Sequence, residues 1–536
     1  MNTSTRRRGI LAGATAAIAT VALALGGGGA ALAASQPVPT SSNVVITKLA
    51  QVSPLGNPAN GTQIADLSGY TTINGVGFSA FLVPGTASGG GNDIRTNSGQ
   101  QFAAQQTVAT ANALVGSNAA AYTGTTSGSG TITWNNVPAG LYVVRETSTP
   151  PGVTAAGDFL LAVPLTNPTS KTDWLSTIYV YPKNAQVGAT KTVANAADLK
   201  VGDTVTWTIA ADIPKVANPA TTGSTDQFLA PDAFQIVDTL TDSELALAGA
   251  SSAAIRVTAG STSLTEGTHY SVTPTTASGN TSYAIVFNSA GRTALATAIN
   301  ASPTAKVTVE LDTVVNSATV IDNVANVYPN QKSITDGTPL TTNAAEAKYG
   351  SYQIVKDSSD AGVTDLSGAV FRVYATEADA RAGNGNYLAP KDNAGVAHDS
   401  WNTNPSGNVT ISGLRYSAWA DGVAQTKFVD NGGTCADYNT GGANCAANPK
   451  YQSYWLVEIT ALPGHQLLAE PVEIVIGDGS ATQTSQVIVN QQNGGGFVLP
   501  LTGGTGTLWL TIGGLVLLAL VLLFVVLRRR REHAAE

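Results

Sequence analysis

The stretch YWLVEITALPGHQLL, residues 454–468, decides the fold of its part of the chain. Its aromatic and β-branched residues predict a β-strand, and the Pro463–Gly464 pair predicts the turn that ends it. A second stretch, GLYVVRETSTPPGV at residues 140–153, has the same order of features. Each strand carries a glutamate, Glu146 or Glu458, just ahead of the turn. The sequence therefore predicts two related β-domains.

Composition extends this prediction to the whole body of the chain. Charged residues make up only 12%, there are 56 glycines, and little sustained helical periodicity is present. This favours an all-β chain of tandem immunoglobulin-like β-sandwich domains. The 536 residues suffice for about three such domains once the two ends are set aside. A formal net charge of −8 without a basic stripe argues against nucleic-acid binding.

The two ends of the chain carry targeting signals. Arg6 to Arg8, an apolar run over residues 10–25 and the small residues ALAAS predict a secretory signal peptide at residues 1–34. Near the other end, LPLTG precedes an uncharged apolar stretch, 508–527, and then Arg528 to Arg531. Roughly 20 apolar residues can form a transmembrane helix, and the arginines would hold its end in the cytoplasm.

This C-terminal arrangement resembles the sorting signal that sortases of Gram-positive bacteria cleave. The resemblance implies that a sortase cysteine attacks the carbonyl of Thr502 and holds the chain as a thioester until an amine resolves it. The matching residues are Leu499, Pro500, Leu501, Thr502 and Gly503, within a signal at 496–536. A plain single-pass membrane protein is the alternative, but it leaves LPLTG unexplained.

A lysine in the stretch VYPKN, residues 180–184, has a matching role. The stretch resembles the motif of shaft subunits in sortase-assembled pili, such as those of Actinomyces and corynebacteria, whose lysine supplies the resolving amine. The resemblance implies that Lys183 of one subunit is joined to Thr502 of the next, giving a head-to-tail polymer. The alternative is a solvated lysine that protects an exposed strand edge.

The body divides into modules at residues 35–185, 186–347 and 348–495. Each begins with a lysine in an apolar strand and ends with an asparagine. The glutamate strands resemble the E-box of B-type (CnaB) pilin domains, and FQIVDTLTD in the middle module resembles the acidic strand of the A-type (CnaA) variant. The resemblance implies intramolecular Lys–Asn isopeptide bonds, each promoted by an acid; the sets are Lys48, Glu146 and Asn184; Lys191, Asp238 and Asn323; and Lys356, Glu458 and Asn490.

The chemistry of such a set depends on burial. Desolvation lowers the pKa of a lysine and raises that of a carboxyl, so the neutral amine becomes a nucleophile and the protonated acid polarises the amide. Two points stay open: Asn326 is a rival acceptor in the middle module, and some shaft subunits leave the first domain uncrosslinked. The alternative reading is a solvated lysine, a surface carboxylate and a strand-end asparagine.

The remaining reactive residues indicate no enzyme. Cys435 and Cys445 lie close together in a secreted chain, which predicts a local disulfide. The four histidines are scattered without metal-ligand spacing, and the sequence shows no catalytic triad or phosphate loop, so no metal, cofactor or turnover activity is expected. A surface hydrolase is therefore disfavoured.

Together these signals predict a structural major pilin. We expect it to be secreted, to be anchored to the cell wall as a surface fimbria, and to support adhesion. Its expected partners are a sortase, further copies of itself, a tip pilin and peptidoglycan, with the membrane only a transient stage. A wall-anchored adhesin that uses the same domains as a stalk is the alternative, although a stalk needs no acceptor lysine.

Overall fold

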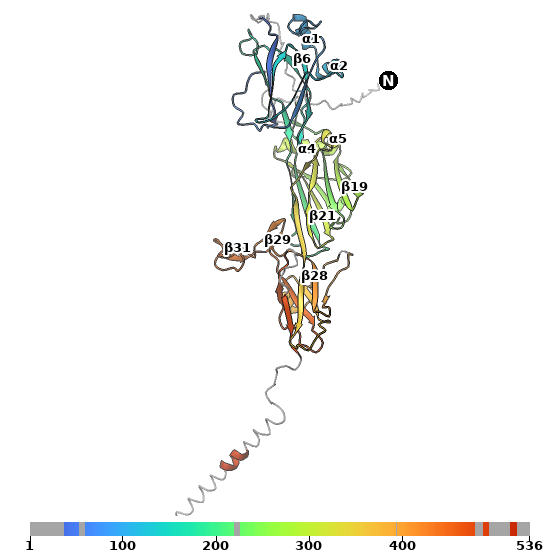
Figure 1. The fold of residues 1–536 in the computed structure, drawn as a ribbon, viewed down its shortest axis with the longest axis vertical. Helices are drawn as coiled ribbons and strands as arrows, with labels where there is room; N and C mark the ends of the chain where they lie inside the picture. Colours follow the sequence, from blue (N-terminus) through green and yellow to red (C-terminus); the bar gives the residue numbers. More distant parts are fainter. Residues whose placement is uncertain are drawn as a thin grey trace, which may run out of the picture.

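The computed structural model of this chain describes residues 37–52, 59–218, 226–392, 394–477, 486–492 and 515–521. It shows three β-rich lobes strung along the long axis, with a side arm at the joint between the second and third (Figure 1). The signal peptide at 1–34 and the LPLTG residues 499–503 lie outside the described residues. Within the described parts, no helix is long and apolar enough to cross a membrane. Of the predicted span at 508–527, only 515–521 are described, as a helix.

The first lobe is a sandwich whose first and last strands are parallel neighbours. One three-stranded sheet has the order β5 (Thr131–Pro138), β1 (Ser41–Thr47), β9 (Thr177–Val180). A second has the order β7 (Val153–Thr154), β10 (Lys183–Gln186), β2 (Leu49–Ala50), in which β2 and β10 follow β1 and β9 along the chain. The facing sheet is β4 (Tyr122–Thr125), β3 (Gly77–Leu82), β6 (Gly140–Ser148), β8 (Phe159–Val163). The core between them includes Val44, Phe78 and Ile178. A smaller core holds α1 (Asn97–Ala104) and α2 (Val108–Val115) on the outer side of β6.

The middle lobe is a larger sandwich built round Trp207 and Ile236, both fully buried. Its six-stranded sheet comprises β11 (Ala189–Ala194), β12 (Thr204–Asp212), β21 (Lys306–Val315), β17 (Ile255–Ala259) and β18 (Thr262–Leu264), with β16 (Leu245–Leu247) on β21. The facing sheet is β19 (Tyr270–Ala277), β20 (Asn280–Phe287), β15 (Gln235–Thr241), β23 (Ala325–Tyr328), β24 (Leu340–Thr341). Smaller elements are β13 (Val216–Ala217), β14 (Phe228–Leu229), α3 (Ser251–Ala254), α4 (Ser289–Ala301) and α5 (Gln331–Asp336).

The third lobe shares a strand with the second. The long strand β25 (Ala345–Ser358) pairs first with β22 (Val320–Asn323), then with β28 (Asn408–Arg415) and β35 (Gln486–Asn490). The facing sheet is β27 (Trp401–Asn402), β26 (Val370–Tyr374), β33 (Tyr454–Thr460), β34 (Val472–Ile474), with α6 (Glu377–Ala382) beside it. The boundary expected between residues 347 and 348 thus falls inside one continuous strand.

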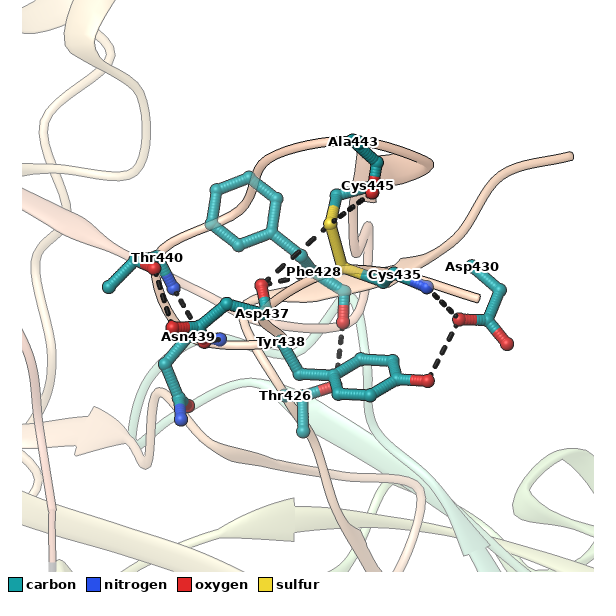
Figure 2. The surroundings of a disulfide bond; sticks show 10 residues. All are labelled: Thr426, Phe428, Asp430, Cys435, Asp437, Tyr438, Asn439, Thr440, Ala443 and Cys445. Carbon is teal, nitrogen blue, oxygen red and sulfur yellow. Dashed lines mark hydrogen bonds between the residues drawn. A yellow bond between two sulfur atoms is a disulfide. The ribbon is translucent and has the colours of Figure 1, made fainter. Parts of the chain in front are cut away.

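The side arm leaves the third lobe between β28 and β33. It contains β29 (Trp419–Ala420) with β30 (Val423–Ala424), and β31 (Phe428–Asp430) with β32 (Cys445–Ala447). The predicted disulfide between Cys435 and Cys445 is present, with an S–S distance of 1.98 Å. Figure 2 shows the Asp430 carboxylate beside it, accepting hydrogen bonds from the Cys435 N–H at 2.8 Å and the Tyr438 hydroxyl at 2.9 Å. The bond therefore closes a Gly- and Asn-rich loop that has little apolar core of its own.

Replacing both Cys435 and Cys445 by serine is expected to loosen this arm. On the chain-entropy argument a disulfide closing so short a loop contributes about 2 to 3 kcal/mol. Amide hydrogen exchange should accelerate over residues 428–447 in the double variant, while β25 and β28 keep their protection. Unchanged exchange in the arm would show that its hydrogen bonds hold the loop without the disulfide.

Candidate functional site

The third lobe brings Lys356, Glu458 and Asn490 together in its core. Lys356 on β25 and Asn490 on β35 are 0% and 1% exposed. The Lys356 Nζ lies 3.5 Å from Glu458 Oε1 and donates to the Ile488 carbonyl at 2.8 Å. Asn490 Nδ2 donates to Glu458 Oε2 at 2.7 Å. Burial lowers the pKa of Lys356, and the nearby Glu458 opposes the shift only in part.

Glu458 faces this core because it alternates with the buried Tyr454 and Leu456 on β33, and a β-bulge follows it directly. Val370 pairs with Thr460 and Phe371 pairs with Glu458, so Ile459 is an extra residue on β33. The Glu458 side chain has no exposed surface, and the Leu468 N–H donates to its Oε2 at 2.8 Å. The carboxyl is therefore fixed between the amine and the amide.

The first lobe repeats this arrangement with Lys48, Glu146 and Asn184. Gly77 pairs with Ser148 and Phe78 with Glu146, which gives the same bulge. Glu146 forms an ion pair with Lys48, and its Oε2 accepts from Asn184 Nδ2 at 2.8 Å. Burial, only partly offset by Glu146, lowers the pKa of Lys48 to about 8.

The strand register explains why lysine and asparagine meet in both lobes. β25 and β35 are parallel, and Ser358 pairs with Asn490, two residues beyond Lys356. β2 and β10 are parallel, and Ala50 pairs with Asn184, two residues beyond Lys48. Side chains two residues apart on a strand share a face, so each lysine lies next to the asparagine of the neighbouring strand on the core face.

The middle lobe forms its cluster between sheets. Lys191 on β11 and Asp238 on β15 are fully buried, with 2.6 Å between Nζ and Oδ2. Burial lowers the pKa of Lys191 and raises that of Asp238, and their mutual attraction opposes both shifts. Asn323 on β22 is 2% exposed and close enough to Asp238 to lower its pKa. Within the described part of the chain, however, neither polar atom of its amide makes a well-aligned hydrogen bond.

The rival acceptor lies elsewhere. Asn326 sits half-buried on β23 between the buried residues Ala325 and Val327, so its side chain is on the opposite face of that strand. Its Oδ1 accepts from the Thr341 hydroxyl at 2.7 Å. The structure thus brings Asn323, rather than Asn326, to the Lys191–Asp238 pair.

Sequence reasoning missed a second contact of this cluster. Asn343 Oδ1 accepts from the Lys191 N–H at 3.0 Å, and its Nδ2 donates to the Lys191 carbonyl at 2.8 Å. This asparagine holds the backbone that carries the buried Lys191 amine. No sequence signal distinguishes it, because it follows two threonines in an ordinary turn-like stretch.

Lys183 occupies the opposite face of β10 from Asn184. Its side chain is half-buried, burial lowers its pKa, and its Nζ lies 5.5 Å from the centre of the Tyr70 ring. The preceding Tyr181 is anchored by its hydroxyl, which accepts from the Ile64 N–H at 2.8 Å. Adjacent residues of one strand therefore present one amine outward and one amide to the core.

Comparison with known proteins identifies this architecture. Residues 39–185 match the family described as Gram-positive pilin subunit D1, N-terminal domain, and residues 491–533 match the LPXTG cell wall anchor motif. The chain carries a Gram-positive pilin domain and a cell wall anchor motif. It is a cell wall-anchored protein of the surface pilus, and the family and fold are those of structural subunits, which are not enzymes.

Relatives of this pilin share most of its length. It is 28% identical to the fimbrial subunit type 1 of Actinomyces viscosus over 74% of both chains, and 27% identical to the fimbrial subunit type 2 of Actinomyces naeslundii over 90% of this chain and 88% of the other. The major pilin SpaD of Corynebacterium diphtheriae superposes with a TM-score of 0.58 at 22% identity, covering 85% of this chain and 98% of that one. The predicted all-β, tandem-sandwich fold is confirmed.

Asn323→Ala is expected to abolish any crosslink in the middle lobe. Of the two candidate asparagines, Asn323 is the one in the core beside Asp238, so the variant should weigh one ammonia more than a crosslinked chain, after allowing for the substitution. Asn326→Ala is the matched control and should keep the crosslinked mass. Intact-mass measurement and peptide mapping of both variants test the assignment, and the reverse pattern would make Asn326 the acceptor.

Proposed function

We propose that this pilin is the major shaft subunit of a covalent polymer. A sortase joins Thr502 of one subunit to Lys183 of the next, and three modules, at 35–185, 186–347 and 348–495, each close an internal Lys–Asn bond. The wall anchor supports final attachment to peptidoglycan, and a tip pilin would cap the shaft. The fibre would support adhesion.

The observation that carries the crosslinking proposal is the burial of lysine, acid and asparagine as a set. Lys48, Lys191 and Lys356 are each at most 1% exposed, and each faces a buried carboxyl. A buried ion pair gains little stability over apolar packing, because desolvation costs about as much as the attraction returns. Stability alone is therefore a weak reason to bury these lysine–carboxylate pairs, whereas the Lys–Asn crosslinking reaction requires them.

The reaction balances without a cofactor. The neutral lysine Nζ attacks the asparagine Cγ, a C–N bond forms, and the acid carries a proton from Nζ to the leaving Nδ2. The C–Nδ2 bond breaks and ammonia leaves. Closing a loop of more than a hundred residues in this way would destabilise the unfolded chain by about 5 kcal/mol on the chain-entropy argument.

Lys183→Arg tests polymerisation. Arginine keeps the charge but offers no usable amine, so the high-mass ladder in a denaturing gel of cell-wall extracts should collapse to monomer. Wall attachment through Thr502 should persist. Lys171→Arg, which changes an exposed lysine of the same lobe, is the control and should leave the ladder intact. A normal ladder in Lys183→Arg would disprove the acceptor assignment.

Glu458→Ala tests the internal reaction. The variant keeps both reacting groups but loses the proton carrier, so it should retain the ammonia of Asn490 and melt at a lower temperature than the unmodified protein. Glu470→Ala, at a side chain that is 67% exposed, should remain crosslinked. Complete crosslinking at Asn490 in Glu458→Ala would exclude the proposed role of this acid.

A further inference from the structure

The turn that follows the glutamate strand of the third lobe touches the reacting amide. The Leu462 N–H donates to Asn490 Oδ1 at 3.3 Å, and the Gln466 carbonyl accepts from Asn490 Nδ2 at 2.8 Å. Glu458 Oε2 takes the other hydrogen of Nδ2 at 2.7 Å. Every polar atom of this amide is therefore engaged before any reaction.

The first lobe has the same turn with one decisive difference. Residues 146–153, ETSTPPGV, align without gaps with residues 458–465, EITALPGH. Val153 N–H donates to the Pro150 carbonyl at 3.2 Å, just as His465 N–H donates to the Leu462 carbonyl at 3.0 Å. Pro150 thus stands where the third lobe has Leu462, and proline has no N–H to donate.

The consequence is visible at the asparagine. Asn184 Oδ1 is buried and finds no hydrogen-bond partner in the described part of the chain. The two clusters otherwise correspond closely: Ala156 N–H donates to Glu146 Oε2 at 3.2 Å, and Leu468, at the same ten-residue spacing, donates to Glu458 Oε2 at 2.8 Å. The chain therefore contains its own comparison between a site with a donor to the amide oxygen and a site without one.

We infer that the backbone N–H of Leu462 is an oxyanion donor for the third-lobe crosslink, and that this bond forms faster than the one in the first lobe. The inference rests on the crosslinking proposed above. When Lys356 Nζ adds to Asn490 Cγ, the π electrons of the carbonyl move to Oδ1, which becomes negatively charged. A fixed N–H already aimed at that oxygen stabilises the charge as it develops.

The remainder of the step leaves the donor unchanged. Collapse of the tetrahedral centre returns the electrons from Oδ1 to Cγ, breaks the Cγ–Nδ2 bond and releases ammonia, with the proton supplied through Glu458. The Gln466 carbonyl stays beside the departing nitrogen. In the first lobe the same charge would develop on Asn184 Oδ1, to which the described residues offer no donor, so the barrier there is higher.

The turn is held rigidly enough for this role. His465 is 7% exposed, and its Nε2 lies 2.6 Å from the Ser358 hydroxyl at the end of β25. The Gln466 N–H donates to the Gln491 carbonyl at 2.8 Å, next to Asn490. Both strands that carry the reacting groups therefore fix the turn, which is the preorganisation that an oxyanion donor requires.

The test compares both sites in one chain. The full chain is synthesised in vitro, samples are quenched in denaturant at intervals, and the Lys48–Asn184 and Lys356–Asn490 peptide pairs are quantified by mass spectrometry after digestion. The third-lobe pair should appear at least about tenfold faster, given that loss of one oxyanion donor typically costs a factor of about a hundred or more. Equal rates would overturn the inference.

Reciprocal variants isolate the N–H. Leu462→Pro installs the residue that the first lobe tolerates in the same turn, and it should slow the third-lobe pair about tenfold relative to Leu462→Ala, which loses the side chain but keeps the N–H. Pro150→Leu should speed the first-lobe pair and does not depend on the folding of Leu462→Pro. Matching rates in Leu462→Pro and Leu462→Ala, or an unchanged rate in Pro150→Leu, would overturn the oxyanion inference but leave the crosslinking proposal standing. Absence of both pairs from the unmodified chain would instead overturn the crosslinking itself, and this inference with it.

Discussion

A lysine amine enclosed in a dry core is the constraint on which the rest of this pilin depends. An isolated ammonium in such surroundings is too costly, so it must lose its proton or face an opposite charge. Each of the three lobes places one buried carboxyl beside its buried lysine. The first and third lobes position this carboxyl in nearly the same way. The amine, the acid and the amide come from three separate segments of the chain, so the cluster forms only when the sandwich has closed.

Strand alternation places both glutamates on the core face, in line with Tyr142 and Val144 in β6 and with Tyr454 and Leu456 in β33, and a β-bulge follows each glutamate. A strand alternates its side chains strictly, and an extra residue shifts that alternation at one point. In β6 and β33 the extra residue lies directly after the glutamate, so the alternation that points the acid to the core is intact up to that residue and changes only in the segment that leads into the turn. The aromatic ring opposite then covers the site: Lys48 Nζ lies 5.7 Å from the centre of the Phe78 ring.

Sequence predicted the residue types of these sites better than their contacts. Glu146 and Glu458 stand out because a charged residue interrupts an apolar strand just before a Pro-Gly turn. The asparagine partners lie over a hundred residues from their lysines. Strand register decides which asparagine lies beside each lysine, so the sequence alone could not distinguish Asn323 from Asn326. Asn343 bonds the backbone of Lys191, and Leu462 bonds Asn490 through its own backbone N–H. Contacts in which one partner is a backbone group leave no pattern of paired side chains in the sequence. The sequence also did not reveal that β25 is shared by two lobes, because one continuous strand and two consecutive strands have similar sequences.

That shared strand makes the two joints of the molecule unequal. Between the second and third lobes, β25 continues without a break, and Leu199 of the middle lobe packs against the core of the third lobe. The fully buried Arg415 donates to the Ala196 carbonyl of the second lobe at 3.4 Å and to the Lys450 carbonyl of the third at 3.3 Å. Between the first and second lobes the hydrogen bonds include Val187 N–H to Gly152 at 2.8 Å and Asn330 to Thr154 at 3.0 Å, and the paired strands of the described residues do not cross this joint. A strand that belongs to two sheets cannot bend without breaking pairs in both, whereas a short connection with side-chain contacts can. The joint between the second and third lobes is therefore held by strand pairing and a buried arginine, whereas the joint beside β10, the strand that carries Lys183, is held by a short connection and hydrogen bonds.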